Sequence, residues 1–306
     1  MNPSRFHRCL AGIWSTLLAL ALAGCASAPA PAPTPEAPPA IQAAPKKAPK
    51  IGLVLGGGAA RGFAHIGVIQ VLEEAGIRPA LVVGTSAGSL VAAFYASGKT
   101  GAQLQQVAET MEEATFADWT LPIFSRGMLR GEALARYVSA QVNGRLIESM
   151  PLPLGIVATD LNSGLGVLFR RGDTATAVRA SSAVPALFQP VRIAGRDYVD
   201  GGLVAPVPVR YARQMGGELV IAVDISDAPE ANAAGDTLQI LLQTFSIMGK
   251  SINNYELREA DVVVRPALLG VSSSDFGARR SAIEAGRAAM RAALPQLRAA
   301  LQRQQL

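Results

Sequence analysis

From residue 51 onward, short apolar runs alternate with longer segments in which apolar residues recur at helical spacing. The predicted strands cover residues 51–55, 81–83, 154–159, 166–169, 197–199, 219–223 and 262–264, and the predicted helices cover residues 63–75, 87–96, 237–253 and 279–302. Strands that alternate with helices favour a mainly parallel sheet covered on both faces. We therefore expect an α/β fold, with no second domain boundary after residue 50.

Two apolar segments leave alternatives open. Residues 114–129 gather large apolar side chains around Pro122, and we expect them either to pack as core or to form a cap that dips into lipid. Residues 279–301 have the pattern of an amphipathic basic helix pair with a break at Pro295. We expect this pair to pack on the sheet, with membrane contact as the alternative.

The first 24 residues have the layout of a secretory signal peptide. Arg5 and Arg8 form a basic head, and residues 10–23 make a largely apolar stretch that is too short to span a bilayer. The end of this stretch, Leu22-Ala23-Gly24-Cys25, resembles the bacterial lipobox. That resemblance implies cleavage before Cys25 and acylation of its thiol, whereas an ordinary signal peptide with an incidental cysteine is the alternative.

Residue Ala26 follows the predicted acylated cysteine, where many lipoproteins of the inner membrane carry Asp. By resemblance, this favours an outer-membrane lipoprotein that faces the periplasm or the surface. Residues 26–50 are built mainly from Ala and Pro, which form neither a helix nor a core. The chain is thus predicted to consist of a signal peptide (1–24), a tether of roughly 75 Å reach (25–50) and a folded body (51–306).

Composition and charge exclude several classes of protein. Of the 306 residues, 50% are hydrophobic, and only two are cysteines, which argues against a disordered chain or a small disulfide scaffold. The formal charge of +5 falls to +3 when the two arginines of the first 24 residues are removed. This balance gives no argument for a nucleic-acid partner.

The glycine-rich loop at residues 56–62 is open to three interpretations. A dinucleotide fingerprint is not met, because Arg61 stands where the last glycine is needed, and no acidic residue closes the second strand. A phosphate-binding loop is not met either, because Phe63 stands where the lysine belongs. The third interpretation is an oxyanion hole, in which backbone N–H groups near Gly57 and Gly58 face a developing negative charge.

A Gly-x-Ser-x-Gly motif at residues 84–88 lies between a predicted strand and a predicted helix. This is the context of a nucleophile elbow, which presents the Ser86 hydroxyl on a strained turn. The start of the following helix adds unpaired N–H groups where an oxyanion would form. The motif and its context therefore predict Ser86 as a nucleophile.

The base that activates Ser86 is not a histidine in the order of an α/β-hydrolase. The chain has only His7 and His65, and both precede Ser86, whereas that family places its histidine after the serine. We interpret His65 as a structural helix residue. The base is then a carboxylate, and the candidates at predicted strand ends or turns are Asp160, Asp200 and Asp224.

Together these motifs resemble the patatin-like phospholipase family, in its bacterial branch similar to neuropathy target esterase. The residues that carry the resemblance are Gly56, Gly57, Gly58, Arg61 and Gly62, then Gly84, Ser86 and Gly88, then Asp200, Gly201 and Gly202, with a further block at 180–185. The resemblance implies a three-layer α/β/α fold, a catalytic dyad of Ser86 and Asp200, and no requirement for a metal or another cofactor.

The function that the resemblance implies is hydrolysis of carboxylic esters of membrane lipids, with phospholipids or lysophospholipids as substrates. Two alternatives stay open. The chain could be a lipid-binding envelope lipoprotein without catalytic activity, or a thioesterase or acyltransferase on the same fold. The sequence contains no feature that separates these enzymes.

Overall fold

The structure is a computed structural model that describes residues 48–112, 118, 127–226, 237–272 and 275–305. The predicted signal peptide, the lipidation site Cys25 and most of the tether lie outside the described residues. The same holds for most of the aromatic cluster at 114–129.

A central sheet organises the body of the chain. Its strands follow the order β10-β9-β1-β2-β4-β8-β7, and β5 pairs with β4 off this path. The neighbours from β10 to β4 are parallel, whereas β5 and β8 are antiparallel to β4, and β7 is antiparallel to β8. The strands are β1 (Ile51–Leu55), β2 (Leu81–Thr85), β4 (Leu154–Asp160), β5 (Gly166–Phe169), β7 (Val191–Ile193), β8 (Arg196–Asp200), β9 (Leu219–Val223) and β10 (Val262–Val264).

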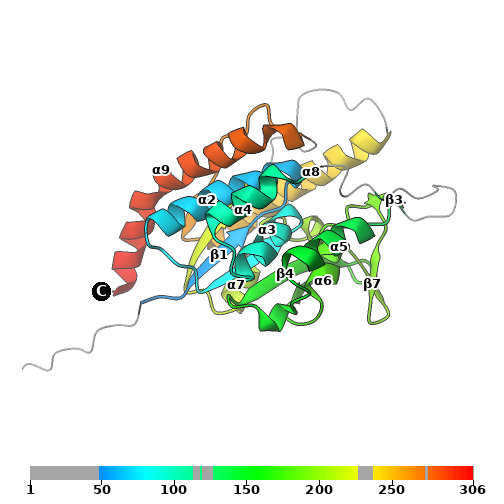
Figure 1. Cartoon of the computed structure of the whole chain (residues 1–306), viewed down its shortest axis with the longest axis horizontal. Coiled ribbons are helices and arrows are strands. Elements are labelled where there is room, and N and C mark those ends of the chain that lie inside the picture. Colours follow the sequence, from blue (N-terminus) through cyan, green and yellow to red (C-terminus); the bar gives the residue numbers. More distant parts are fainter. Residues whose placement is uncertain (1–47, 113–117, 119–126, 227–236, 273–274, 306) are drawn as a thin grey trace, which may run out of the picture. The chain divides into compact units, whose positions relative to one another are not determined.

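Helices cover both faces of this sheet (Figure 1). The α-helices are α2 (Ala64–Glu74), α3 (Ala87–Ala96), α4 (Gly101–Glu109), α5 (Glu132–Gln141), α6 (Thr174–Ser181), α7 (Val209–Gln214), α8 (Thr237–Glu256) and α9 (Arg279–Gln305). The 3-10 turns are η2 (Ala59–Phe63), η4 (Ile147–Ser149), η5 (Gly201–Leu203), η6 (Leu257–Glu259) and η7 (Phe276–Ala278). A small separate sheet pairs β3 (Gly127–Leu129) with β6 (Ala186–Phe188).

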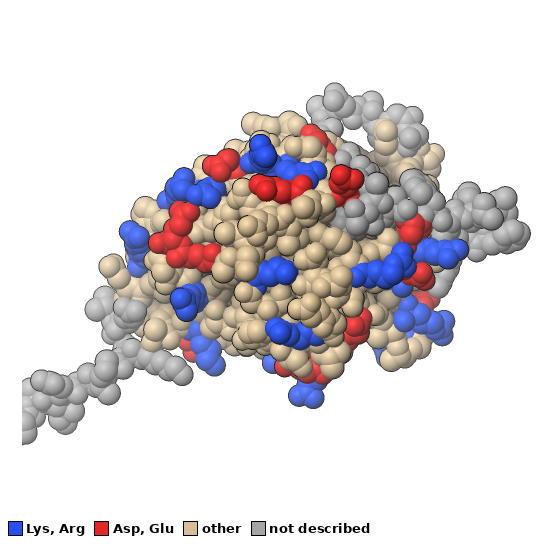
Figure 2. Space-filling model, in the orientation of Figure 1, with Lys and Arg blue, Asp and Glu red and all other residues tan. Residues whose placement is uncertain are grey.

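The core forms on both faces because neighbouring side chains of a strand point to opposite sides. In β1, Leu53 and Leu55 join the cluster that includes α2, α3 and α9, whereas Val54 joins the cluster that includes α7. In β9, Ile221 and Val220 divide between the clusters in the same way. The predicted three-layer α/β/α arrangement with a mainly parallel sheet is therefore confirmed. On the face shown in Figure 2, basic and acidic side chains are interspersed.

The last helix corrects one prediction. Residues 279–305 form a single helix with Pro295 inside it, rather than two helices with a break. The interior proline costs about 3 kcal/mol relative to alanine, but Met290 and Leu297 on either side of it are fully buried. Their burial outweighs that cost and keeps the helix continuous.

Helix α9 packs closely on α2 through glycine. A Cβ atom at Gly286 would collide with the carbonyl group of Ala64, and one at Gly67 would collide with the carbonyl of Ile283. The two backbones therefore approach each other at positions where only glycine leaves room. Helix α9 thus packs beside α2 and against β10, and its buried side chains join those of β1, β9 and β10 in one core cluster.

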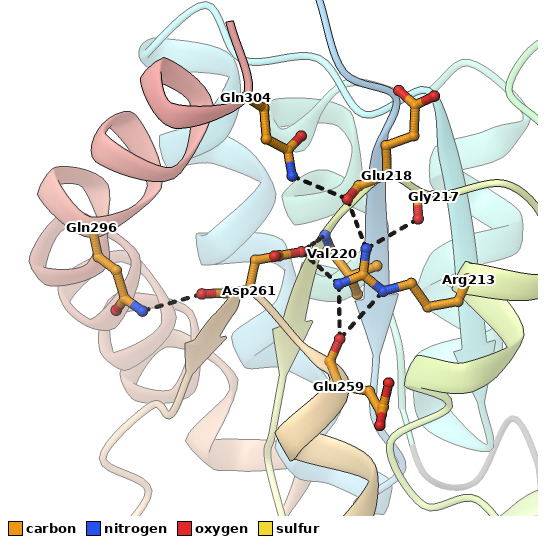
Figure 3. A network of polar contacts seen from close by, with 8 residues as sticks. All are labelled: Arg213, Gly217, Glu218, Val220, Glu259, Asp261, Gln296 and Gln304. Atoms are coloured by element: carbon orange, nitrogen blue, oxygen red, sulfur yellow. Dashed lines mark hydrogen bonds and ion pairs between the residues drawn. The ribbon is translucent and has the colours of Figure 1, made fainter. Parts of the chain in front are cut away.

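Arg213 at the end of α7 joins the segments at the amino-terminal edge of the sheet (Figure 3). Its guanidinium donates to the carbonyls of Gly217, Glu218 and Glu259, with shortest distances of 3.2, 2.7 and 2.9 Å. It also pairs with the Asp261 carboxylate at 2.7 Å. The same carboxylate oxygen accepts from the Val220 amide, so one ion pair fixes the starts of β9 and β10.

We predict that Arg213→Ala lowers the free energy of unfolding by about 2 kcal/mol, because it leaves several backbone carbonyls and one carboxylate without their donor. Urea denaturation followed by circular dichroism measures the change. The control is Arg298→Ala, an exposed arginine of α9, which should stay within about 0.5 kcal/mol of the parent. Equal midpoints for the two variants would contradict the role of Arg213.

Candidate active site

Ser86 lies on the sharp turn between β2 and α3. Its backbone has φ 53° and ψ −124°, a conformation that side chains rarely adopt. A Cβ atom at Gly84 would collide with the carbonyl of Gly88, and one at Gly88 would collide with the carbonyl of Leu55. Both glycines of the predicted elbow are therefore required by close backbone approach.

Ser181 at the end of α6 holds the backbone of this turn through a hydrogen bond. It is fully buried, and its hydroxyl accepts a hydrogen bond from the Ser86 amide at 2.9 Å while donating to the Val157 carbonyl at 2.6 Å. The motif at residues 180–185 contains Ser181 but does not indicate this role. A buried serine in the last turn of a helix gives no sequence signal that names its partner.

The register of β4 brings Asp200 next to the elbow. Thr85, the last residue of β2, pairs with Val157, and Asp200, the last residue of β8, pairs with Ala158. Strand β5 pairs with one edge of β4. Strands β2 and β8 therefore both pair with the opposite edge of β4, one after the other along its length. The structure thus places Ser86 and Asp200 at adjacent strand ends, with the Ser86 side chain close enough to the Asp200 carboxyl to lower its pKa.

Asp200 is held by its own backbone and by its neighbours. Its amide donates to the Ala183 carbonyl at 2.9 Å, and its carbonyl accepts from the Thr159 hydroxyl at 2.8 Å. Its carboxylate accepts from the Gly202 amide at 2.6 Å. Gly201 lies against the Val157 carbonyl, where a Cβ atom would collide. The carboxylate is therefore fixed in one orientation toward the elbow.

The protonation of Asp200 is strongly perturbed. The residue is only 6% exposed, and burial raises the pKa of its carboxyl to about 6, although hydrogen bonds from Ser86 and Gly202 oppose the shift. A carboxylate with this pKa is a better proton acceptor than an exposed one and is still ionised at neutral pH. The pair can therefore act as a nucleophile and its base.

The glycine-rich loop follows β1 and lies beside Ser86. A Cβ atom on Gly57 would sit 3.2 Å from the Ser86 Cβ. However, the Gly57 amide already donates to the Pro206 carbonyl at 2.9 Å, and the Gly56 amide donates to Val223 at 3.1 Å. Among the described residues the Gly58 amide has no such acceptor, so of the two predicted oxyanion donors only Gly58 is available without a rearrangement.

The rest of the loop supports this arrangement. Arg61 is 8% exposed and lies in η2, where its Nε is 3.4 Å from the Gly58 carbonyl. Gly62 lies against Ala87 at the start of α3, because a Cβ atom there would be 2.9 Å from the Ala87 Cβ. The turn is thus packed directly on the elbow.

The two other acidic candidates lie in turns and carry ion pairs. Asp160 accepts from the amides of Asn162 and Ser163 and pairs with Arg196 at 2.8 Å, which lowers its pKa. The Asp224 carboxylate accepts from the amide and hydroxyl of Ser226 and pairs with Arg265 at 3.3 Å. Neither carboxylate makes a hydrogen bond to Ser86 within the described residues, and both stabilise local backbone.

His65 is fully buried in α2, with its Nε2 2.8 Å from the Gly56 carbonyl. Burial lowers the pKa of its imidazole to about 4, so the ring is neutral at neutral pH and its Nε2 donates to that carbonyl. The ring therefore holds the start of the glycine loop, in keeping with its interpretation as a structural residue.

Among the described residues, no three His, Cys, Asp or Glu side chains are grouped as a metal site would require. Within the same residues, no helix is both long and apolar enough to span a bilayer.

Comparisons with known proteins identify the family of the chain. A profile described as patatin-like phospholipase matches residues 53–213, which include both Ser86 and Asp200. An uncharacterized NTE family protein of Mycobacterium tuberculosis is 36% identical over 201 residues, covering 65% of this chain and 55% of that protein. Patatin-like phospholipase domain-containing protein 6 of Homo sapiens is 35% identical over 198 residues, covering 61% of this chain and 14% of that protein. The chain thus spans about half the length, or less, of these curated relatives.

Among solved structures, VipD from Legionella pneumophila is similar in fold, with a TM-score of 0.56 and 16% sequence identity over 82% of this chain and 67% of that one. Because the family profile spans more than half of the chain and covers the elbow, the glycine loop and Asp200, this protein belongs to the patatin-like phospholipase family.

Proposed function

We propose that the protein is a serine acyl hydrolase that cleaves carboxylic esters of membrane lipids. The observation that carries this proposal is the contact between Ser86, on its strained turn, and the buried Asp200 carboxylate, whose pKa is raised to about 6. A nucleophile that touches its base within a glycine-lined turn is the arrangement that acyl transfer needs.

In the first step, Asp200 accepts the proton of the Ser86 hydroxyl as the serine oxygen attacks the ester carbonyl. The carbonyl oxygen of the resulting tetrahedral intermediate carries the negative charge. The Gly58 amide and the N–H groups at the start of α3 are the proposed donors to this oxygen. Collapse of the intermediate releases the alcohol, which takes the proton back from Asp200.

In the second step, water attacks the acyl-Ser86 ester, and Asp200 again acts as base. The carboxylic acid leaves, and the Ser86 hydroxyl is restored. No metal or organic cofactor enters this sequence of bonds. Transfer of the acyl group to an alcohol instead of water, and attack on a thioester, would use the same residues, so an acyltransferase or a thioesterase is the second candidate on this site.

Lipids are the proposed substrate class because of the family to which the chain belongs. Similarity to the human patatin-like phospholipase domain-containing protein 6 supports phospholipids or lysophospholipids in particular. We also propose that the protein works at a membrane as an outer-membrane lipoprotein, acylated at Cys25 and joined to its anchor by residues 26–50. A lipid-binding lipoprotein without activity is the alternative that labelling of Ser86 would exclude.

Ser86→Ala should reduce ester hydrolysis by roughly 10³-fold or more and abolish covalent labelling by a fluorophosphonate, because no other group can attack the ester. Labelling is measured by in-gel fluorescence, and hydrolysis is measured on a soluble short-chain ester and on phospholipid vesicles. Ser182→Ala, a half-buried serine beside Ser181, is the control and should keep its label. Labelling of the Ser86→Ala protein would exclude this nucleophile.

The rate should depend on pH through Asp200. The carboxylate must be ionised to accept the proton, and its pKa is about 6, so kcat/KM on a soluble ester should be constant above about pH 7. Below about pH 6 it should fall tenfold per pH unit. Because the pKa of His65 is near 4, that residue contributes no inflection at pH 6.

The Asp200→Asn variant keeps the size of the side chain but cannot accept the proton, so activity should fall at least about 10²-fold and the inflection should disappear. Asp160→Asn and Asp224→Asn are the matched controls, and both should retain the inflection near pH 6. An Asp200→Asn enzyme with the parent profile would assign the base to another group.

Cys25→Ser removes the thiol on which acylation would occur. The variant should no longer incorporate radioactive palmitate, and most of it should leave the membrane fraction, since a single interfacial contact binds more weakly than an acyl anchor. Labelling and detergent-free fractionation of cells that express the parent and the variant measure both effects. Undiminished palmitate in the variant would refute the lipidation site.

A further inference from the structure

Helix α8 leaves a group of large apolar side chains exposed to solvent. Among the described residues, eight large hydrophobic side chains are exposed, and four of them lie on this one helix: Ile240, Ile247, Met248 and Tyr255, which are 49–70% exposed. None of residues 237–248 is buried, although Leu238, Leu241, Leu242 and Phe245 are also apolar. A group of exposed apolar side chains on one helix is normally covered by protein or lipid.

The exposed residues form one stripe. Ile240, Ile247 and Tyr255 are seven and eight residues apart, which places them on the same side of a helix. Two hydroxyl groups between them are satisfied within the helix, because the Thr244 hydroxyl donates to the Ile240 carbonyl at 2.8 Å and the Ser246 hydroxyl to the Leu242 carbonyl at 3.1 Å. Burial of the stripe would therefore keep these two hydroxyl groups hydrogen-bonded.

The charges of the helix are confined to its second half. No residue between Thr237 and Gly249 is charged, and Lys250 is exposed, whereas Glu256 is buried and paired with Arg210 at 2.6 Å. The only exposed charge of α8 is therefore positive, which suits anionic lipid headgroups beside an apolar stripe.

The carboxyl-terminal half of α8 packs on the segment that holds the glycine loop. Gly249 faces Pro206, and the Asn253 side chain accepts from the Val207 amide at 3.2 Å and donates to the Ser226 hydroxyl at 3.4 Å. The Pro206 carbonyl is the acceptor for the Gly57 amide beside Ser86. This half of the helix is thus one contact away from the candidate active site.

The amino-terminal half extends past the edge of the sheet at which Ser86 lies. Asn253 is level with the end of β9, and the chain then returns through Glu256 and η6 to the start of β10 at the opposite edge. Residues 237–248 therefore project about 18 Å in the other direction, at 1.5 Å per residue. Figure 1 shows this part of α8 in yellow, at the end of the body that is far from the start of β1.

From these contacts we propose that the apolar stripe of α8 docks onto the surface of a lipid bilayer and presents the Ser86 edge of the sheet to it. The helix lies in the interface rather than across the bilayer, since it is not apolar enough to span one. The choice of a bilayer as the occupant rests on the proposed function, whereas the exposure of the stripe does not. Leucine, isoleucine and aromatic side chains beside a lysine form the kind of face that inserts at the headgroup boundary.

The direct test places a fluorophore on the stripe and adds vesicles. The full chain carries Cys9→Ser and Cys25→Ser, which removes both natural cysteines and any acyl anchor, together with Ile247→Cys labelled with an environment-sensitive nitrobenzoxadiazole dye. The control carries the dye at Leu146→Cys, an exposed leucine (43%) that pairs with Asp173 at the far end of α6 from Ser181. Vesicles of phosphatidylcholine with phosphatidylglycerol should raise the emission at position 247 at least about twofold, and nitroxide lipids should quench it. The dye at position 146 should not respond.

A second arm measures catalysis with Ile240→Glu/Ile247→Glu and the control Leu146→Glu. The double variant should hydrolyse vesicle phospholipid at least about tenfold more slowly than the parent and a soluble short-chain ester at the parent rate, and Leu146→Glu should match the parent on both. Thermal melting checks that the variants fold, since all three sites are exposed.

The outcomes separate docking from chemistry. The absence of a vesicle response at position 247 overturns the docking surface, whether or not the protein is an esterase. A response at position 247 in a protein that hydrolyses neither substrate sustains the docking surface and rejects the proposed function. Emission that rises with protein concentration, without lipid, assigns the stripe to a second copy of the chain and overturns the bilayer as its occupant.

Discussion

The positive φ of Ser86 is the constraint on which the candidate site depends. A serine in this conformation is strained by about 1–3 kcal/mol, and it persists only where the surroundings determine it fully. Here the backbone cannot relax, because Gly84 and Gly88 are pressed against neighbouring carbonyls and the Ser86 amide is held by Ser181. The packing of three elements, β1, α3 and α6, therefore maintains a turn that the local sequence alone would not adopt.

A second tension concerns the charge of Asp200. Burial raises the free energy of its ionised form, and the amide of Gly202 and the hydroxyl of Ser86 offset only part of that increase. The same burial that makes the carboxylate a stronger base also makes its charge unfavourable for folding. The pKa of Asp160 shifts in the opposite direction. Its pairing with Arg196 stabilises the ionised carboxylate and so makes it a weaker base than a reaction would need.

Much of the fold was predictable because its signals are local. The runs that became β9 and β10 are uninterrupted apolar segments, and α3 begins directly after the glycine-flanked serine, so their limits were predicted from sequence. The predicted break at Pro295 was wrong. Proline disfavours a helix locally, but the burial of Met290 and Leu297 on either side of it keeps the helix continuous. The choice of Asp200 among three acidic residues needed either a family resemblance or the register of β4. Ser181 and the engagement of the Gly57 amide by Pro206 depend on contacts between segments more than 90 residues apart, for which the sequence carries no pattern.

The end of α6 and the two residues after it contact both proposed catalytic residues. The Ser181 hydroxyl holds the amide of Ser86, and two residues later the Ala183 carbonyl accepts from the amide of Asp200. The positions of both groups therefore depend on the same short segment. A small displacement of α6 would move Ser86 and Asp200 together and leave the distance between them almost unchanged. Anyone who transplants this dyad into another scaffold would need to transfer that short segment along with the two strand ends, since neither strand by itself sets the separation.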